Sequence, residues 1–137
     1  MNISEIYQQY KIMPQLQLHM LRVAGVASII ADNFEDGVEN DSIVTACLLH
    51  DMGNIIKANL TLFLKGGNKE IKYWEKVKKD FTDRYGNKDH IATHKICEEL
   101  GIDQNTIKLI DGFGFVKTPE IHDSQNVARK ICVYSDM

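Results

Sequence analysis

The residues best suited to chemistry in this chain are the adjacent His50 and Asp51. They lie in the segment Ala46–Gly53, where polar side chains that can bind a metal interrupt an apolar helical run. Burying an imidazole beside a carboxylate is costly unless a further group pairs with both of them. Because a metal ion can pair with both at once, this dipeptide indicates a metal site.

Two further side chains have the same setting on other predicted helices. His19 interrupts the apolar segment 16–24, and Asp136 closes the apolar segment 131–136. The order along the chain is therefore a histidine, a His-Asp pair and an aspartate, on separate helices. Imidazole nitrogens and carboxylate oxygens in this mixture suit a divalent metal such as manganese, iron, nickel, zinc or magnesium.

This ordered pattern resembles the HD-domain superfamily of metal-dependent phosphohydrolases. The resemblance extends from about Met13 to Met137 and rests on the segments 18–24, 46–53 and 131–136. It implies an all-helical bundle in which the metal ligands meet in the interior and hold one divalent metal ion. By this resemblance the ligands are His19, His50, Asp51 and Asp136.

The spacing of apolar residues predicts an all-α fold, because these residues recur at helical intervals and no alternating strand pattern stands out. Together with the resemblance, this gives an HD-domain bundle of about six to seven helices. The predicted helices span residues 4–10, 14–33, 41–53, 70–85, 89–100 and 103–111, with a last one from about 123 or 124. The turn and loops predicted between them are at 36–37, 61–68 and 112–119.

The length of 137 residues fits one domain with a single core. A formal net charge of −3 argues against a protein that coats nucleic acid. No apolar run reaches membrane-spanning length and no signal peptide opens the chain, so neither membrane insertion nor secretion is expected. The three cysteines are widely spaced among apolar residues, which predicts free buried thiols and a cytoplasmic protein. The oligomeric state stays open, with a homodimer among the alternatives.

The last predicted helix is still apolar and periodic where the chain stops, one residue after Asp136. Natural helical domains seldom end on a ligand that faces the core. We therefore expect residues 1–137 to form one HD domain of a natural protein that continues further.

A phosphate ester needs cations around its non-bridging oxygens, and three residues could supply a polar wall beside the metal. Arg22 follows His19 by three positions, while Asn54 and Lys57 follow His50 by four and seven positions, on the same helix face. These residues are predicted to bind the substrate, and Lys57 also to act in catalysis. The alternative that Arg22 and Lys57 are simply exposed to solvent stays open.

A second pair of histidines, His90 and His94, is spaced to share one face of a predicted helix. Many HD domains have an additional histidine on a following helix, and by this resemblance His90 is either a second-metal ligand or a catalytic donor to the phosphate. His94 is then predicted to bind the substrate. Two-metal members usually have further histidines before the last aspartate, whereas residues 109–114 contain none. We therefore expect one metal, with a second as the less favoured alternative.

The sequence thus predicts a phosphohydrolase that acts through a metal-activated water on a small phosphorylated substrate, foremost a nucleotide. Asp51 is expected to bind the metal and to orient the water, which makes it the leading catalytic residue. Signalling relatives carry a lysine after the glycine of the His-Asp motif and a later Gly-Tyr-Pro motif. Here Asn54 follows Gly53 and no Gly-Tyr-Pro occurs, which argues against a cyclic dinucleotide as substrate.

Two other functions stay open at this point. A non-catalytic HD module would bind the metal and sense a nucleotide without turning it over. A di-iron HD oxygenase would need a second iron, which the missing histidines disfavour.

Overall fold

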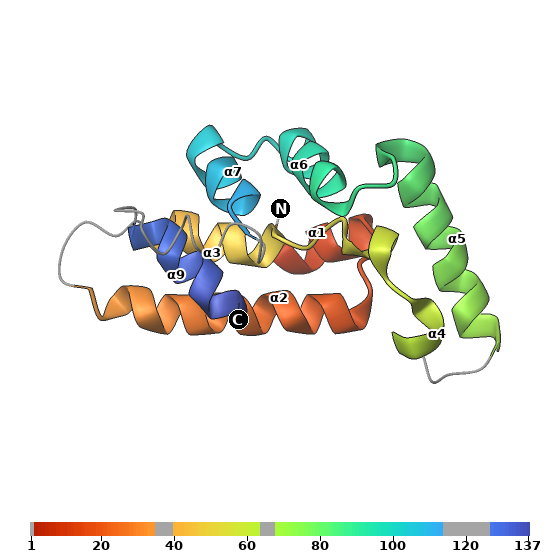
Figure 1. The fold of residues 1–137 in the computed structure, drawn as a ribbon, viewed down its shortest axis with the longest axis horizontal. Coiled ribbons are helices and arrows are strands. Elements are labelled where there is room, and N and C mark those ends of the chain that lie inside the picture. Colours follow the sequence, from red (N-terminus) through yellow and green to blue (C-terminus); the bar gives the residue numbers. More distant parts are fainter. Residues whose placement is uncertain (1, 35–39, 64–67, 114–126) are drawn as a thin grey trace.

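The computed structural model describes residues 2–34, 40–63, 68–113 and 127–137. Within these ranges the chain forms helices and no strand, which confirms the predicted all-α class (Figure 1). The helices are α1 (Ile3–Gln9), α2 (Pro14–Asp32), α3 (Asn40–Leu49), the 3-10 helix η1 (Asn54–Lys57), α4 (Leu60–Phe63), α5 (Asn68–Tyr85), α6 (Asp89–Glu99), α7 (Gln104–Asp111) and α9 (Val127–Asp136).

Two short elements were not expected from the sequence. Helix α4 begins at Leu60 and extends into the predicted loop 61–68, and η1 follows the His-Asp segment. The described ranges therefore hold more helices than predicted. Helix α3 also ends at Leu49, before His50, rather than continuing to Gly53. The predicted turn at 36–37, the loop after Phe113 and the start of the last helix lie outside the described residues.

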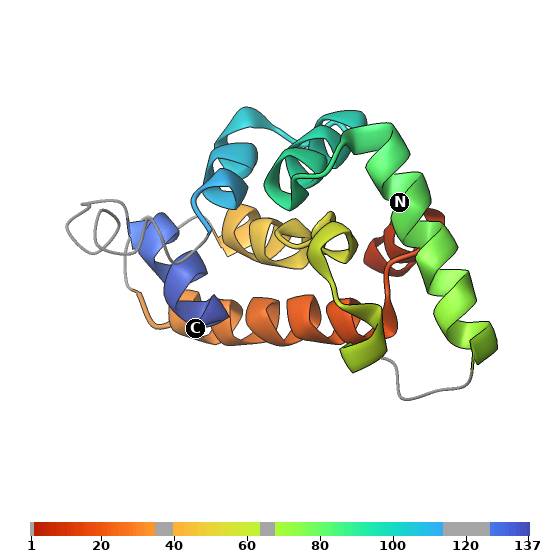
Figure 2. The same ribbon diagram turned by 45° about the vertical axis from the view of Figure 1, so that its right-hand side comes forward.

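Helix α3 lies between α2 on one side and α7 on the other, and α9 crosses both α2 and α3 (Figures 1 and 2). Small side chains allow α2 and α3 to approach closely, since Ala27 of α2 and Ala46 of α3 are fully buried. Helix α6 packs on η1, and α5 covers the same end of the molecule. The three elements that carry the predicted metal ligands are thus neighbours.

Buried groups near the end of α3 are satisfied by distant parts of the chain. The hydroxyl of Tyr7, on α1, donates to the carbonyl oxygen of Leu48 at 2.7 Å, which anchors the last turn of α3.

All three cysteines, Cys47, Cys97 and Cys132, are buried and free, as predicted. None of the described helices is long and apolar enough to cross a membrane.

Gly53 is required by the close approach of α6 to the turn that follows Asp51. A Cβ atom at this position would lie 2.5 Å from the carbonyl oxygen of Asp89 and 2.7 Å from the Cβ of Ala92. The amide of Gly53 donates to the hydroxyl of Thr93, also on α6, at 2.9 Å. The turn is therefore clamped directly against the backbone of α6.

Replacing Gly53 by alanine is expected to destabilise the protein by about 1–3 kcal/mol, because the backbone of α6 must move to admit a methyl group. Denaturant unfolding measures this loss. The matched control is Gly25→Ala on α2, where a Cβ would meet nothing within 4 Å. That change should be neutral or stabilise by about 0.5–1 kcal/mol, as alanine does in helices. Equal effects of the two substitutions would refute the close packing at Gly53.

Candidate metal centre

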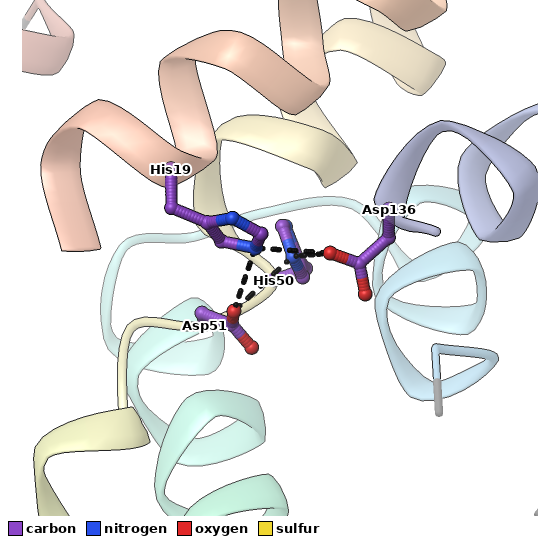
Figure 3. Close-up of side chains that lie close together, drawn as sticks. All are labelled: His19, His50, Asp51 and Asp136. Carbon is purple, nitrogen blue, oxygen red and sulfur yellow. Dashed lines mark hydrogen bonds and ion pairs between the residues drawn. The ribbon is translucent and has the colours of Figure 1, made fainter. Parts of the chain in front are cut away.

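Four side chains from three separate parts of the chain converge on one point (Figure 3). His19 comes from α2, His50 and Asp51 come from the turn after α3, and Asp136 is the last residue of α9. One potential ligand atom from each of these residues lies within 4.8 Å of the others. The convergence predicted from the sequence is therefore found, while the binding of an ion stays a prediction.

His50 is held in the tautomer that a metal ligand needs. Its side chain is buried, and its Nδ1 lies 2.6 Å from the carbonyl oxygen of Cys47. A carbonyl oxygen can only accept a hydrogen bond, so Nδ1 carries the proton and donates. In the neutral ring the lone pair is then on Nε2, which faces the cluster. The ring of Phe113 stacks on His50 with centroids 4.3 Å apart and fixes its plane.

The distances within the cluster are those between neighbouring ligands of one ion. His19 Nε2 lies 2.9 Å from Asp136 Oδ1 and 3.3 Å from Asp51 Oδ2. His50 Nε2 lies 3.2 Å from the same Asp136 oxygen and 3.3 Å from the same Asp51 oxygen. Ligands about 2.1 Å from a metal and at right angles are roughly 3.0 Å apart. Two imidazoles and two carboxylates at this spacing fit a divalent transition metal.

Without an ion, protons on the imidazoles compensate the carboxylates. Burial would lower the pKa of His50, but hydrogen bonds to Asp136 and Asp51 outweigh burial and raise that pKa to about 10. The hydrogen bond to Asp51 also raises the pKa of His19. Burial would raise the pKa of Asp51, yet its bonds from both imidazoles hold that pKa well below its usual range. A metal ion would have to displace the protons on the two Nε2 atoms.

The cluster opens into a cavity of about 400 Å³. His19 and Asp51 line it together with Asn54 and Lys57, the two residues predicted to contact substrate from this part of the chain. Lys57 Nζ lies 3.2 Å from Asp89 Oδ2, and 57% of the lysine side chain is exposed. Asn54 Oδ1 is buried without a hydrogen-bond partner, which leaves polar capacity beside the cavity.

The structure does not bring the other predicted site residues to this cavity. Arg22 is exposed on α2 and is absent from the cavity lining. His90 and His94 line a different hollow with Asp111, and the side chain of His90 is 64% exposed. The buried side chains of α6 face the core, which leaves both histidines on its outer side. His94 contacts Asp111 of α7, whereas His90 Nε2 lies 3.8 Å from Asp89 Oδ2, the oxygen that also contacts Lys57. The cavity lining does not include Arg22, His90 or His94, and their roles in catalysis or substrate binding stay predictions.

His94 has partners of its own on that other face. Its Nδ1 lies 3.0 Å from Asp111 Oδ1, and its Nε2 lies 2.7 Å from Glu98 Oε1. The hydrogen bond to Asp111 raises the pKa of His94. The contact with Asp111 joins α6 to α7, and the contact with Glu98 lies within α6. Both nitrogens of His94 therefore have carboxylate partners.

Some residues around the site were missed by the sequence analysis. Gln15 and Leu16 line the cavity four and three positions before His19, so helical spacing alone could have indicated them. Asp89, which holds Lys57, is far away in the sequence and has no local signal.

Comparison with protein families gives one result. The family model "HD domain" matches residues 17–101. The matched range includes His19, His50 and Asp51, while Asp136 lies beyond it and is assigned to the cluster by geometry. No curated protein and no solved structure matches the chain.

Protein stripped by a chelator is expected to bind about one Mn²⁺ or Zn²⁺ per chain. The ion would join three elements: α2, α9 and the turn after α3. A metal concentration a hundredfold above Kd should therefore stabilise the fold by about 2.7 kcal/mol. Elemental analysis and thermal unfolding measure both effects. Asp136→Ala should lose the ion, whereas the control His90→Ala should retain it. Full metal content in Asp136→Ala would remove this carboxylate from the site.

The apparent metal affinity is expected to rise with pH, by up to about tenfold per unit for each proton displaced. In ion-free protein, a raised histidine pKa stabilises the fold fully below the unfolded value of 6.5 and ceases to do so as pH rises through about 10. The chelated protein should thus lose stability between these values, while the Mn²⁺-loaded protein should not. Denaturant unfolding with and without Mn²⁺ tests this, and parallel pH profiles of the two forms would contradict it.

Proposed function

Because this chain belongs to the HD domain family, we propose that it is a metal-dependent phosphohydrolase acting on a nucleotide or another small phosphate ester. The observation that carries the proposal is the convergence of His19, His50, Asp51 and Asp136 beside a cavity. Two members of this cluster, His19 and Asp51, line that cavity together with Lys57. The donor set favours one divalent ion, with manganese, iron, nickel, zinc and magnesium all suited to it.

When bound, such an ion supplies a Lewis acid that polarises the phosphoryl group and lowers the pKa of a coordinated water. The four residues of the cluster would hold it. Asp51 has a second task, because it lines the cavity as well as belonging to the cluster. Its carboxylate can therefore orient a water on the substrate side.

Lys57 would bind a non-bridging oxygen of the phosphate. It is already held at the cavity by Asp89, at 3.2 Å, so the ammonium group is placed before a substrate arrives. A phosphate dianion carries more charge than one carboxylate and can compete for this lysine. Asp89 is therefore a positioning residue, since it acts on the substrate through Lys57.

The number of potential ligand clusters also bears on the two rival functions. Among the residues that the structure describes, one cluster of three or more potential metal ligands is found. A di-iron oxygenase would need ligands for a second iron, and no further cluster of the described residues supplies them. A nucleotide sensor would use the same cavity, so turnover separates it from the phosphohydrolase.

The variants Asp51→Ala and Lys57→Ala are expected to fail in different ways. Asp51→Ala should lose both the metal and all measurable turnover of a phosphate ester, because a ligand is removed. Lys57→Ala should keep the metal and raise KM about tenfold with a small change in kcat, since it binds ground and transition states alike. Steady-state kinetics on Mn²⁺-loaded protein measure both.

The charge control for Lys57 is Lys79→Ala. Lys79 is an exposed lysine on α5 that pairs with Asp83 and does not line the cavity. Its loss should leave KM unchanged. If Lys57→Ala and Lys79→Ala have the same KM as the parent, Lys57 does not bind the substrate. If metal-loaded protein binds nucleotide without turnover, the sensor replaces the phosphohydrolase.

A further inference from the structure

The cavity beside the metal cluster has walls of two kinds. Its floor is formed by His19 and Asp51, and Lys57 supplies the positive charge. Much of the remaining lining is apolar and consists of Met13, Leu16 and Ala58. Met13 is buried and Leu16 packs against the core, so this apolar wall is part of the fold rather than a loose surface patch.

The charges around the cavity suit one phosphoryl group. Lys57 is the one lysine or arginine among the described residues that line it. Two carboxylates, Asp51 and Asp136, already face the ion site, and Asp89 partly neutralises Lys57. A triphosphate chain has several more ionised oxygens, each of which needs a cation or hydrogen-bond donor once it leaves water. Apart from Lys57, the described lining offers those oxygens two neutral side-chain amides, Gln15 and Asn54, and otherwise apolar groups, with no second lysine or arginine.

The size of the cavity also favours a ligand with one phosphoryl group. A volume of about 400 Å³ is near the lower end of the range of roughly 300–1,000 Å³ that ligand pockets occupy. After one phosphoryl group is placed at the floor, the apolar wall can cover a compact organic group. Such a wall favours the face of a base or another ring over further phosphates.

We propose that this cavity selects a phosphomonoester, with its single phosphoryl group at the His19–Asp51 floor and its organic group against Met13 and Leu16, over the corresponding polyphosphate. The proposal rests on the proposed phosphohydrolase activity. In the reaction the oxygen of water forms a bond to phosphorus and the bond from phosphorus to the ester oxygen breaks. The ester oxygen leaves with a proton from that water, which gives an alcohol and inorganic phosphate.

The test compares the mono-, di- and triphosphate of one nucleoside, so that only the number of phosphoryl groups changes. Binding to the Mn²⁺-loaded protein is measured by calorimetry, and turnover by release of inorganic phosphate. The monophosphate is expected to bind at least tenfold more tightly than the triphosphate and to have the highest kcat/KM. The binding measurement does not depend on turnover, so the two proposals can fail separately.

A positive charge introduced into the cavity lining provides a second, independent test of the preference for the monophosphate. Gln15 is exposed and lines the cavity, so Gln15→Lys adds a cation there with little risk to folding. This variant should reduce the preference for the monophosphate severalfold by improving binding of the triphosphate. The matched control is Gln8→Lys, an exposed position on α1 outside the cavity lining, which should leave the preference unchanged.

Each outcome decides the inference. Tighter binding of the monophosphate supports it, with or without turnover, and absence of turnover then counts against the phosphohydrolase alone. Tighter binding or faster hydrolysis of the triphosphate overturns the inference and leaves the phosphohydrolase standing. Equal binding of the three compounds, or binding of none, overturns the inference too. An unchanged preference in Gln15→Lys would exclude the wall as its cause.

Discussion

The packing of α2, α3 and α9 depends on compensating charge where these elements meet. Two imidazoles and two carboxylates lie there within hydrogen-bond distance, and His50 is entirely shielded from water. Removal of any one partner would leave a buried or half-buried charge without compensation. Protons on the imidazoles meet this requirement in the absence of an ion, and a divalent cation meets it with the imidazoles neutral. The site could therefore exchange protons for a metal ion.

The scaffold brings the charged groups together by fixing the positions of their side chains rather than by surrounding them with polar groups. The carbonyl oxygen of Cys47 sets the tautomer of His50, and Phe113 sets the plane of its ring. Tyr7 anchors the carbonyl oxygen of Leu48 in the same turn. A core of small residues, with Ala27 and Ala46 fully buried, brings α2 close enough to α3 for the imidazoles to meet. Rigid packing thus places ligands from distant parts of the chain.

The ligands and most helices could be predicted because each has a local cause. Polar residues in apolar runs identified His19, His50 and Asp51, and helical periodicity placed most of the helix boundaries to within a few residues. The end of α3 at Leu49 was not predicted, because residues up to Gly53 are compatible with helix and the packing of this turn against α6 has no local sequence signal. The direction in which the His90 and His94 side chains point could not be predicted either, since it depends on which side of α6 packs on η1.

The contact between α6 and the turn after Asp51 also links the His/Asp cluster to Lys57 at the cavity. Asp89 begins α6 and holds Lys57, and one turn later Thr93 accepts the amide of Gly53. Both contacts act on a single short segment that contains Asp51 and Lys57. If α6 shifts, the ligand and the cation move together, so their separation is set by one interface. A fixed separation lowers the entropy lost when a ligand bridges the ion and Lys57, and it restricts binding to groups of matching length. Under the proposed function, the placement of Asp51 and Lys57 on one short segment, with an apolar wall beside them, would favour one phosphoryl group over a chain of them.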